Sequence, residues 1–127
     1  MTAGVLEMLA VLIGGGVGSA ARFFIDSVVT RGVRRGRGGT NAFPWGITVV
    51  NLSGSFVLGL LLGADLVWPA IGAGLLGGYT TFSTASLDTV RLLREKRYVA
   101  AAGNAFGTLG IAVILATTGL LLGSFWR

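Results

Sequence analysis

Apolar residues dominate this chain and collect in four long runs, while most charged residues fall in the short segments between them. Three of the runs contain no charged residue: Pro44–Ala64, Leu66–Leu87 and Tyr98–Trp126. A fourth run, Met8–Ala21, becomes long enough to cross a bilayer only if its helix continues past Arg22. A hydrocarbon core of about 30 Å takes roughly 20 helical residues to cross. The pattern therefore predicts four membrane-spanning helices.

The predicted fold is all-α, a single four-helix transmembrane domain over residues 1–127 whose third helix is broken near its centre. The predicted spans lie at about 5–29, 44–64, 67–90 and 99–123. Between the first two spans, the glycine-rich basic segment Thr30–Phe43 predicts a mobile connection at the bilayer surface. The other connections are short, so consecutive helices are expected to be antiparallel neighbours.

Composition strengthens the membrane interpretation and weakens an enzymatic one. Hydrophobic residues make up 53% of the chain and charged residues 12%, whereas soluble domains carry about 25% charged residues. Cysteine and histidine are absent, which excludes disulfides, a thiol nucleophile, a histidine base and the commonest metal ligands. The chain has five acidic residues, too few to favour a carboxylate or metal centre. We expect a protein that is not an enzyme and needs no organic cofactor.

Glycines recur four residues apart within the predicted spans, which places them on one face of a helix. Five such pairs occur: Gly14/Gly18, Gly59/Gly63, Gly74/Gly78, Gly103/Gly107 and Gly119/Gly123. Small residues at this spacing let helix backbones approach closely in lipid. The pairs predict tight helix packing, and so thin a bundle is expected to associate with another copy or a homologue.

The basic residues are distributed unevenly between the two predicted ends of the bundle. Of ten basic residues, eight fall in the first and third connections: Arg31, Arg34, Arg35, Arg37, Arg91, Arg94, Lys96 and Arg97. The opposite end holds Arg127 alone. By the positive-inside rule, both basic connections lie in the cytoplasm and both termini outside a plasma membrane. The net charge of +5 is thus interpreted as topology and not as nucleic-acid binding.

Polar residues inside predicted spans are the best candidates for function, because burying them in lipid is costly. Asn51 shares a helix face with Thr48 and Ser55, and its amide either donates to an anion or forms an interhelical hydrogen bond. Asn104 and Thr108 share a face of the fourth span.

Charges also occur near the inner end of the first span. Arg22 and Asp26 stand four apart, and a structural salt bridge between them is favoured over a ligand site. Arg22 also has the charge to concentrate anions in a vestibule.

The centre of the third span is the strongest local signal. Its residues Gly77–Ser86 read GGYTTFSTAS, a run of glycines, β-branched and hydroxyl residues that makes a poor helix. Non-helical backbone at that depth occurs where it is buried in protein or lines a watery cavity. A break here frees carbonyls to bind a cation, and hydroxyls and amides to bind an anion.

Three stretches carry a resemblance along nearly the whole chain: GGGVGSAARFF at 14–24, PWGITVVNLSGSFVLGLLLG at 44–63 and GLLGGYTTFSTASLDTVRLL at 74–93. The sequence resembles the small fluoride channels of the Fluc (CrcB) family. The resemblance implies an antiparallel, dual-topology-type dimer of four-helix subunits with two ion pathways between them. It further implies passive export of toxic fluoride from the cytoplasm.

The resemblance also assigns roles to individual residues. Asn51 corresponds to a pore-lining asparagine, and Phe82 to the first of two phenylalanines whose positive ring edges face the anion. Ser83 and Thr84 supply hydroxyls beside it. The remaining implied ion-pathway residues are Asn104, Thr108 and Arg22.

A structural sodium ion is the one cofactor-like partner that the resemblance implies. The backbone carbonyls of Gly77 and Thr80 match the positions that hold this ion at the dimer centre. The expected partners are therefore fluoride, sodium, the lipid bilayer and a homologous subunit.

The chain departs from the family pattern at two important positions. Ala85 stands where the second phenylalanine is expected, and Asn104 stands at the position of a fourth-helix tyrosine. Thr108 replaces a serine, and Asp88 replaces a glutamate. A homodimer of inverted subunits needs a chain that inserts both ways, and the charge bias opposes this. We therefore favour a heterodimer with an oppositely oriented homologue over a homodimer.

Two alternatives remain. The first is a non-conducting assembly or regulatory subunit, which the losses at Ala85 and Asn104 keep open. The second is a small multidrug-type transporter. That class uses a carboxylate deep in the first span, but Glu7 and Asp26 lie near its two ends.

Overall fold

The computed structural model describes residues 2–37 and 43–126, and within them all regular structure is helical. The elements in chain order are α1 (Thr2–Arg37), α2 (Trp45–Gly63), η1 (Ala70–Leu76), α3 (Gly77–Tyr79), α4 (Phe82–Arg94), α5 (Tyr98–Ala102), η2 (Gly103–Gly107) and α6 (Thr108–Ser124). The segments η1 and η2 are π-helical. Since α3 follows η1 directly, and α5, η2 and α6 follow one another directly, the chain forms fewer and longer helical runs than these labels suggest.

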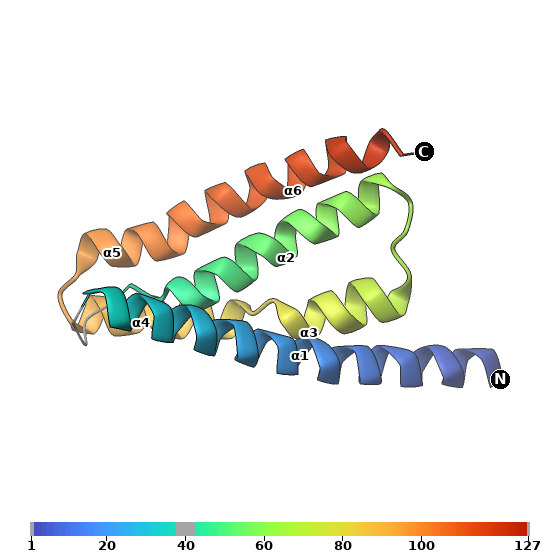
Figure 1. The fold of residues 1–127 in the computed structure, drawn as a ribbon, viewed down its shortest axis with the longest axis horizontal. Helices are drawn as coiled ribbons and strands as arrows, with labels where there is room; N and C mark the ends of the chain where they lie inside the picture. Colours follow the sequence, from blue (N-terminus) through green and yellow to red (C-terminus); the bar gives the residue numbers. More distant parts are fainter. Residues whose placement is uncertain (1, 38–42, 127) are drawn as a thin grey trace.

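The helices run back and forth in one bundle (Figure 1). The middle helix, α2, has α6 on one side and α1 with the α3–α4 region on the other. The two termini lie at the same end as the connection from α2 to η1, and the turn from α4 to α5 lies at the opposite end, next to the end of α1. This arrangement agrees with the predicted antiparallel order of neighbouring helices.

Within the described residues, three helical runs are long and apolar enough to cross a membrane: Gly4–Gly36, Trp45–Gly63 and Tyr98–Ser124. The second and third of these runs agree with the predicted spans at about 44–64 and 99–123 to within one residue at each end. The stretch predicted as the third span is not a continuous helix, because Thr80 and Thr81 separate α3 from α4.

The first helix is longer than predicted. Its predicted end is near Val29, with a mobile connection over Thr30–Phe43, but α1 continues to Arg37. The segment contains no proline to stop a helix, and arginine is a good helix former whose positive charge is favourable at a helix C-terminus. The part of the predicted connection at 38–42 lies outside the described residues.

Glycines bring the backbones of two helix pairs together. A Cβ atom added at Gly59 would collide with the backbone carbonyl of Ala116 on α6, and one added at Gly78 would collide with that of Gly15 on α1. The other members of four predicted pairs make similarly close approaches: Gly14, Gly18, Gly63, Gly74, Gly119 and Gly123. The close-packing prediction is confirmed for these four pairs. It is wrong within this subunit for Gly103/Gly107, where added Cβ atoms meet nothing within 4 Å.

Candidate functional site

The centre of the site is a two-residue interruption between α3 and α4. Thr80 and Thr81 have extended backbone, with φ/ψ of −75°/157° and −149°/124°. The hydroxyl of Thr81 caps the new helix by accepting a hydrogen bond from the Thr84 amide at 3.3 Å. The chain thus ends one half-helix and begins another at the strand-like Thr80–Thr81 step, seen as the thin segment beside α3 in Figure 1.

Asn51 of α2 holds this interruption from the side. Its Nδ2 donates to the Thr81 carbonyl at 2.9 Å, and its Oδ1 accepts from the Thr81 amide at 2.8 Å. The Asn51 side chain therefore bonds both backbone groups of Thr81, and it replaces the helical acceptor that the Thr81 amide lacks. Of the two alternatives that the sequence left open for Asn51, the interhelical hydrogen bond is the one formed here. Because an amide nitrogen carries two hydrogens, a second donor of Asn51 remains.

The Gly77 and Thr80 carbonyls, which are predicted to bind a cation, do not receive the backbone N–H groups that they would accept in a continuous α-helix. In a continuous helix the Gly77 carbonyl would accept from the Thr81 amide, but that amide bonds to Asn51. The Thr80 carbonyl would accept from the Thr84 amide, which bonds to the Thr81 hydroxyl instead. The Thr80 hydroxyl is occupied in its own helix, donating to the Leu76 carbonyl at 2.9 Å. Carbonyl oxygens are suitable ligands for an alkali cation, so the donor set fits sodium chemically.

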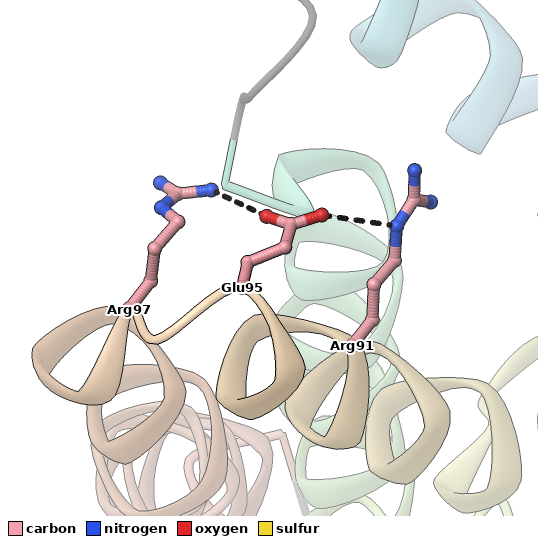
Figure 2. Close-up of polar contacts among 3 residues, drawn as sticks. All are labelled: Arg91, Glu95 and Arg97. Atoms are coloured by element: carbon pink, nitrogen blue, oxygen red, sulfur yellow. Dashed lines mark ion pairs between the residues drawn. The ribbon is translucent and has the colours of Figure 1, made fainter.

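Arg22 reaches the same interruption from α1. Its Nη1 lies 3.5 Å from the Thr80 carbonyl oxygen, where carbonyls at a helix end carry partial negative charge. The predicted Arg22–Asp26 salt bridge is wrong: Arg22 forms no ion pair with a described residue, and Asp26 accepts a hydrogen bond from Thr30 at 3.2 Å. Glu95 forms ion pairs with two arginines, lying between Arg91 and Arg97 at the end of α4 (Figure 2).

A small cluster of hydroxyls surrounds the start of α4. The Thr81 hydroxyl lies 3.1 Å from that of Thr84 and 3.4 Å from that of Ser83. Between them in sequence, Phe82 is 88% exposed, so its ring is not packed inside the subunit. The predicted residues Ser83 and Thr84 therefore lie close to Thr81, and the Phe82 ring is exposed on the surface of the subunit.

A groove of about 740 Å³ lies beside the interruption, between α2, the α3–α4 region and the fourth helical run. The predicted residues that it brings together are Asn51, Gly77, Thr80, Phe82, Asn104 and Thr108. A second cavity, of about 210 Å³, lies toward the basic connections and includes Thr84 with Asp26 and Asp88. Arg22 and Ser83 line neither of these two spaces.

Asn104 is fixed by hydrogen bonds at one wall of this groove. Its Nδ2 donates to the Ala85 carbonyl at 3.0 Å and to the Thr89 hydroxyl at 2.8 Å, and the residue is 4% exposed. Ala85 and Asn104, the two positions at which the sequence is expected to differ from the family it resembles, are therefore in direct contact. They join α4 to the π-helical segment η2.

Sequence reasoning missed two supporting groups. Thr81 was not assigned a role. Threonine is a preferred N-cap residue, so its place before the run that forms α4 is a signal that could have identified it. Ser19 of α1 donates to the Gly78 carbonyl at 3.3 Å, and nothing in the sequence pattern indicates that partner.

Helices long enough to span a bilayer, packed through glycines around an interrupted helix and a mainly apolar groove that carries a few polar side chains, define a small multi-pass membrane protein of the transport type. A family model described as "CrcB-like protein, Camphor Resistance (CrcB)" matches residues 9–120. The chain belongs to this family, which confirms the resemblance drawn from its motifs.

Individual relatives cover nearly all of the chain. "Fluoride-specific ion channel FluC 1" of Leifsonia xyli subsp. xyli is 46% identical over 125 residues, which cover 93% of this chain and 87% of the relative. The protein of the same name from Symbiobacterium thermophilum is 42% identical, with coverage of 89% and 95%. "Fluoride-specific ion channel FluC 2" of Mycobacterium bovis is 37% identical, with coverage of 98% and 97%.

Proposed function

We propose that this chain is a subunit of a fluoride-selective passive channel that lets fluoride leave the cytoplasm and so lowers its toxicity. The observation that carries the proposal is the interruption at Thr80–Thr81, held by Asn51 and followed by an exposed Phe82 beside a mainly apolar groove into which a few uncharged polar groups are set. Family membership and the names of relatives that cover nearly the whole chain support fluoride as the ion. A channel of this kind performs no covalent chemistry.

The groove suits a small anion that must pass without being trapped. The described residues that line it carry no formal charge, so nothing there holds an anion by a full ion pair. Phe82 offers a positively polarised ring edge, and Asn51 retains an N–H donor. Hydroxyls of Ser83 and Thr84 continue the polar surface along α4. Arg22, set back on α1, contributes positive potential without lining the groove.

A partner subunit completes the pathway in this proposal. The groove-lining residues Phe82 and Phe106 are 88% and 77% exposed, and rings so exposed beside the polar groups of Asn51, Thr80 and Asn104 favour cover by protein. An antiparallel arrangement of two subunits would place the two interruptions together. The carbonyls of Gly77 and Thr80 would then bind a sodium ion, whose positive charge would offset the partial negative charge of the carbonyls at the two interruptions.

We favour a heterodimer, in which the partner is an oppositely oriented homologue. Basic residues crowd one end of the bundle, which supports insertion in a single orientation, with both termini outside the plasma membrane. A homodimer of inverted copies would require the same chain to insert both ways.

A second candidate function is a non-conducting assembly or regulatory subunit. The hydrogen bond from Asn104 to the Ala85 carbonyl favours this second function. It fixes the groove surface at the position where a second phenylalanine ring would otherwise face the ion. A multidrug-type transporter is not supported, since no described groove-lining residue is a carboxylate.

The test is fluoride efflux from liposomes, followed with an ion-selective electrode and with chloride as the control ion. The chain is reconstituted alone and together with a homologue of reversed loop charge from the same genome. Fast, fluoride-selective efflux by the pair and not by the chain alone supports the heterodimer. Efflux by the chain alone supports the channel and contradicts the requirement for a different partner. Silence in both preparations contradicts the channel.

A further inference from the structure

The end of the bundle at which α1 stops and α4 turns into α5 carries seven described basic residues, here called the basic end. They are Arg31, Arg34, Arg35, Arg91, Arg94, Lys96 and Arg97. The two groups come from distant parts of the sequence but face one another, because Arg34 of α1 and Arg91 of α4 line the same cavity. The fold thus gathers these charges on one surface.

The extension of α1 determines where its arginines lie. At about 1.5 Å per residue, its 36 residues span roughly 54 Å, more than the 40–45 Å of a bilayer with its headgroups. The helix therefore extends beyond the hydrocarbon, and its last two turns do so at the end where Arg34 and the interfacial residue Trp45 line the same cavity. Arg31, Arg34 and Arg35 are exposed there, at spacings of three and four that place them on neighbouring parts of one helix face. None of the three forms an ion pair with a described residue.

The arginines near α4 are held in position by an acid. Glu95 lies 3.5 Å from Nε of Arg91 and 3.6 Å from Nη1 of Arg97. Figure 2 shows the two terminal nitrogens of Arg91 pointing away from Glu95, so they remain available as donors. Arg94 and Lys96 are exposed beside this cluster. Asp26 and Asp88 line the same cavity as Arg34 and Arg91, so three acids face seven basic residues and the basic end stays net positive.

Aromatic residues mark the same level of the bundle. Trp45 begins α2 and is 40% exposed, and Tyr98 begins α5 and is 64% exposed. Both residue types prefer the interface between lipid tails and headgroups. Their positions put the neighbouring arginines within reach of lipid phosphates.

We propose that the basic end binds the phosphate groups of anionic lipids in the leaflet that it faces, with Arg31, Arg34 and Arg35 as the principal contacts. Charge complementarity selects this partner, since guanidinium groups match phosphate oxygens and Arg31, Arg34 and Arg35 are exposed without an ion pair to a described residue. The proposal does not depend on fluoride conduction.

Tryptophan quenching by brominated lipid tests this directly, because Trp45 reports on the basic end. In a Trp68→Phe/Trp126→Phe background, the protein is placed in vesicles containing brominated phosphatidylglycerol or brominated phosphatidylcholine. Each basic side chain near an anionic surface contributes roughly fivefold to attraction at low salt. We expect phosphatidylglycerol to be favoured several-fold over phosphatidylcholine, and this preference to weaken as salt is raised.

Matched variants separate charge from folding. In R31Q/R34Q/R35Q most of the preference should be lost, with a remainder from the four other basic side chains, whereas R31K/R34K/R35K should keep most of it. Equal quenching by phosphatidylcholine in all variants shows that the fold is retained. A preference unchanged in the glutamine variant, or absent from the parent, overturns the proposal. Loss of the preference with millimolar inorganic phosphate, but not with sulfate of equal ionic strength, would identify a free-phosphate site and also overturn it.

Discussion

The middle helix α2 contacts its two neighbours in different ways. Toward α6 it presents Gly59 and Gly63, which let the two backbones touch without a side-chain hydrogen bond. Toward the α3–α4 interruption it presents Asn51, whose amide satisfies both backbone groups of Thr81. The glycine contact is general membrane packing, and it builds the bundle. The asparagine contact maintains an irregular backbone that lipid alone would not tolerate, and it builds the site.

The largest effect is expected on the glycine side. In Gly59→Val the new Cβ would collide with the Ala116 backbone, and neither helix can move without losing its other contacts. Overpacking typically costs about 1–3 kcal/mol, and more when backbone must shift. We expect loss of most monodisperse protein on size-exclusion chromatography. Gly16→Val is the control, since a Cβ there meets nothing within 4 Å. Equal yields from the two variants would refute the packing account.

The next largest effect is expected at the asparagine. Asn51→Leu leaves the buried Thr81 amide without its partner, at about 1–3 kcal/mol, and removes one of the bonds to the Thr81 carbonyl. Fluoride efflux should fall by about 100-fold or more, and the thermal midpoint should drop. Thr48→Val, on the same face, should change both little, because that hydroxyl bonds to the Pro44 carbonyl one turn earlier. Normal efflux in Asn51→Leu would show that conduction does not need the two hydrogen bonds between Asn51 and Thr81.

A smaller effect is expected at Asn104. Asn104→Leu removes the bonds to Ala85 and Thr89 and should lower the free energy of unfolding by about 1–2 kcal/mol. Combined with Thr89→Val, the loss should be less than additive, because the two side chains share one bond. A double-mutant cycle in detergent measures this. If the two losses of stability add strictly, the Asn104–Thr89 hydrogen bond does not stabilise the fold, and Asn104 keeps a role in the ion pathway alone.

The smallest effect is expected at Thr80. Its hydroxyl bonds to the Leu76 carbonyl within its own helix, so a cation would meet the carbonyl and not the hydroxyl. Thr80→Val should therefore keep any dependence of thermal stability on sodium, measured against N-methylglucamine as the replacing cation. If that dependence disappears in the valine variant, the hydroxyl is a ligand and the carbonyl assignment is wrong.

The sequence predicted the helical runs well because apolar length is a strong signal, and glycine spacing indicated four of the close contacts. It placed the end of α1 too early, since a basic, glycine-containing segment looked like a connection when nothing in it stops a helix. At the site, composition marked Gly77–Ser86 as a poor helix, and the extended backbone falls at Thr80 and Thr81 within that run. The partners of Asn51, Arg22 and Asn104 depend on which helices meet, and spacing along one helix does not contain that information.

The central claim is that fluoride passes beside the interruption, and Phe82 tests it most directly. Its ring is 88% exposed in the subunit, so Phe82→Ile should leave the fold intact. Fluoride efflux is compared between the reconstituted parent channel and the variant at equal amounts of assembled protein. The account predicts a fall of about 100-fold or more with unchanged assembly, because the positive ring edge is lost. Unchanged fluoride efflux in the isoleucine variant would place the ion pathway elsewhere.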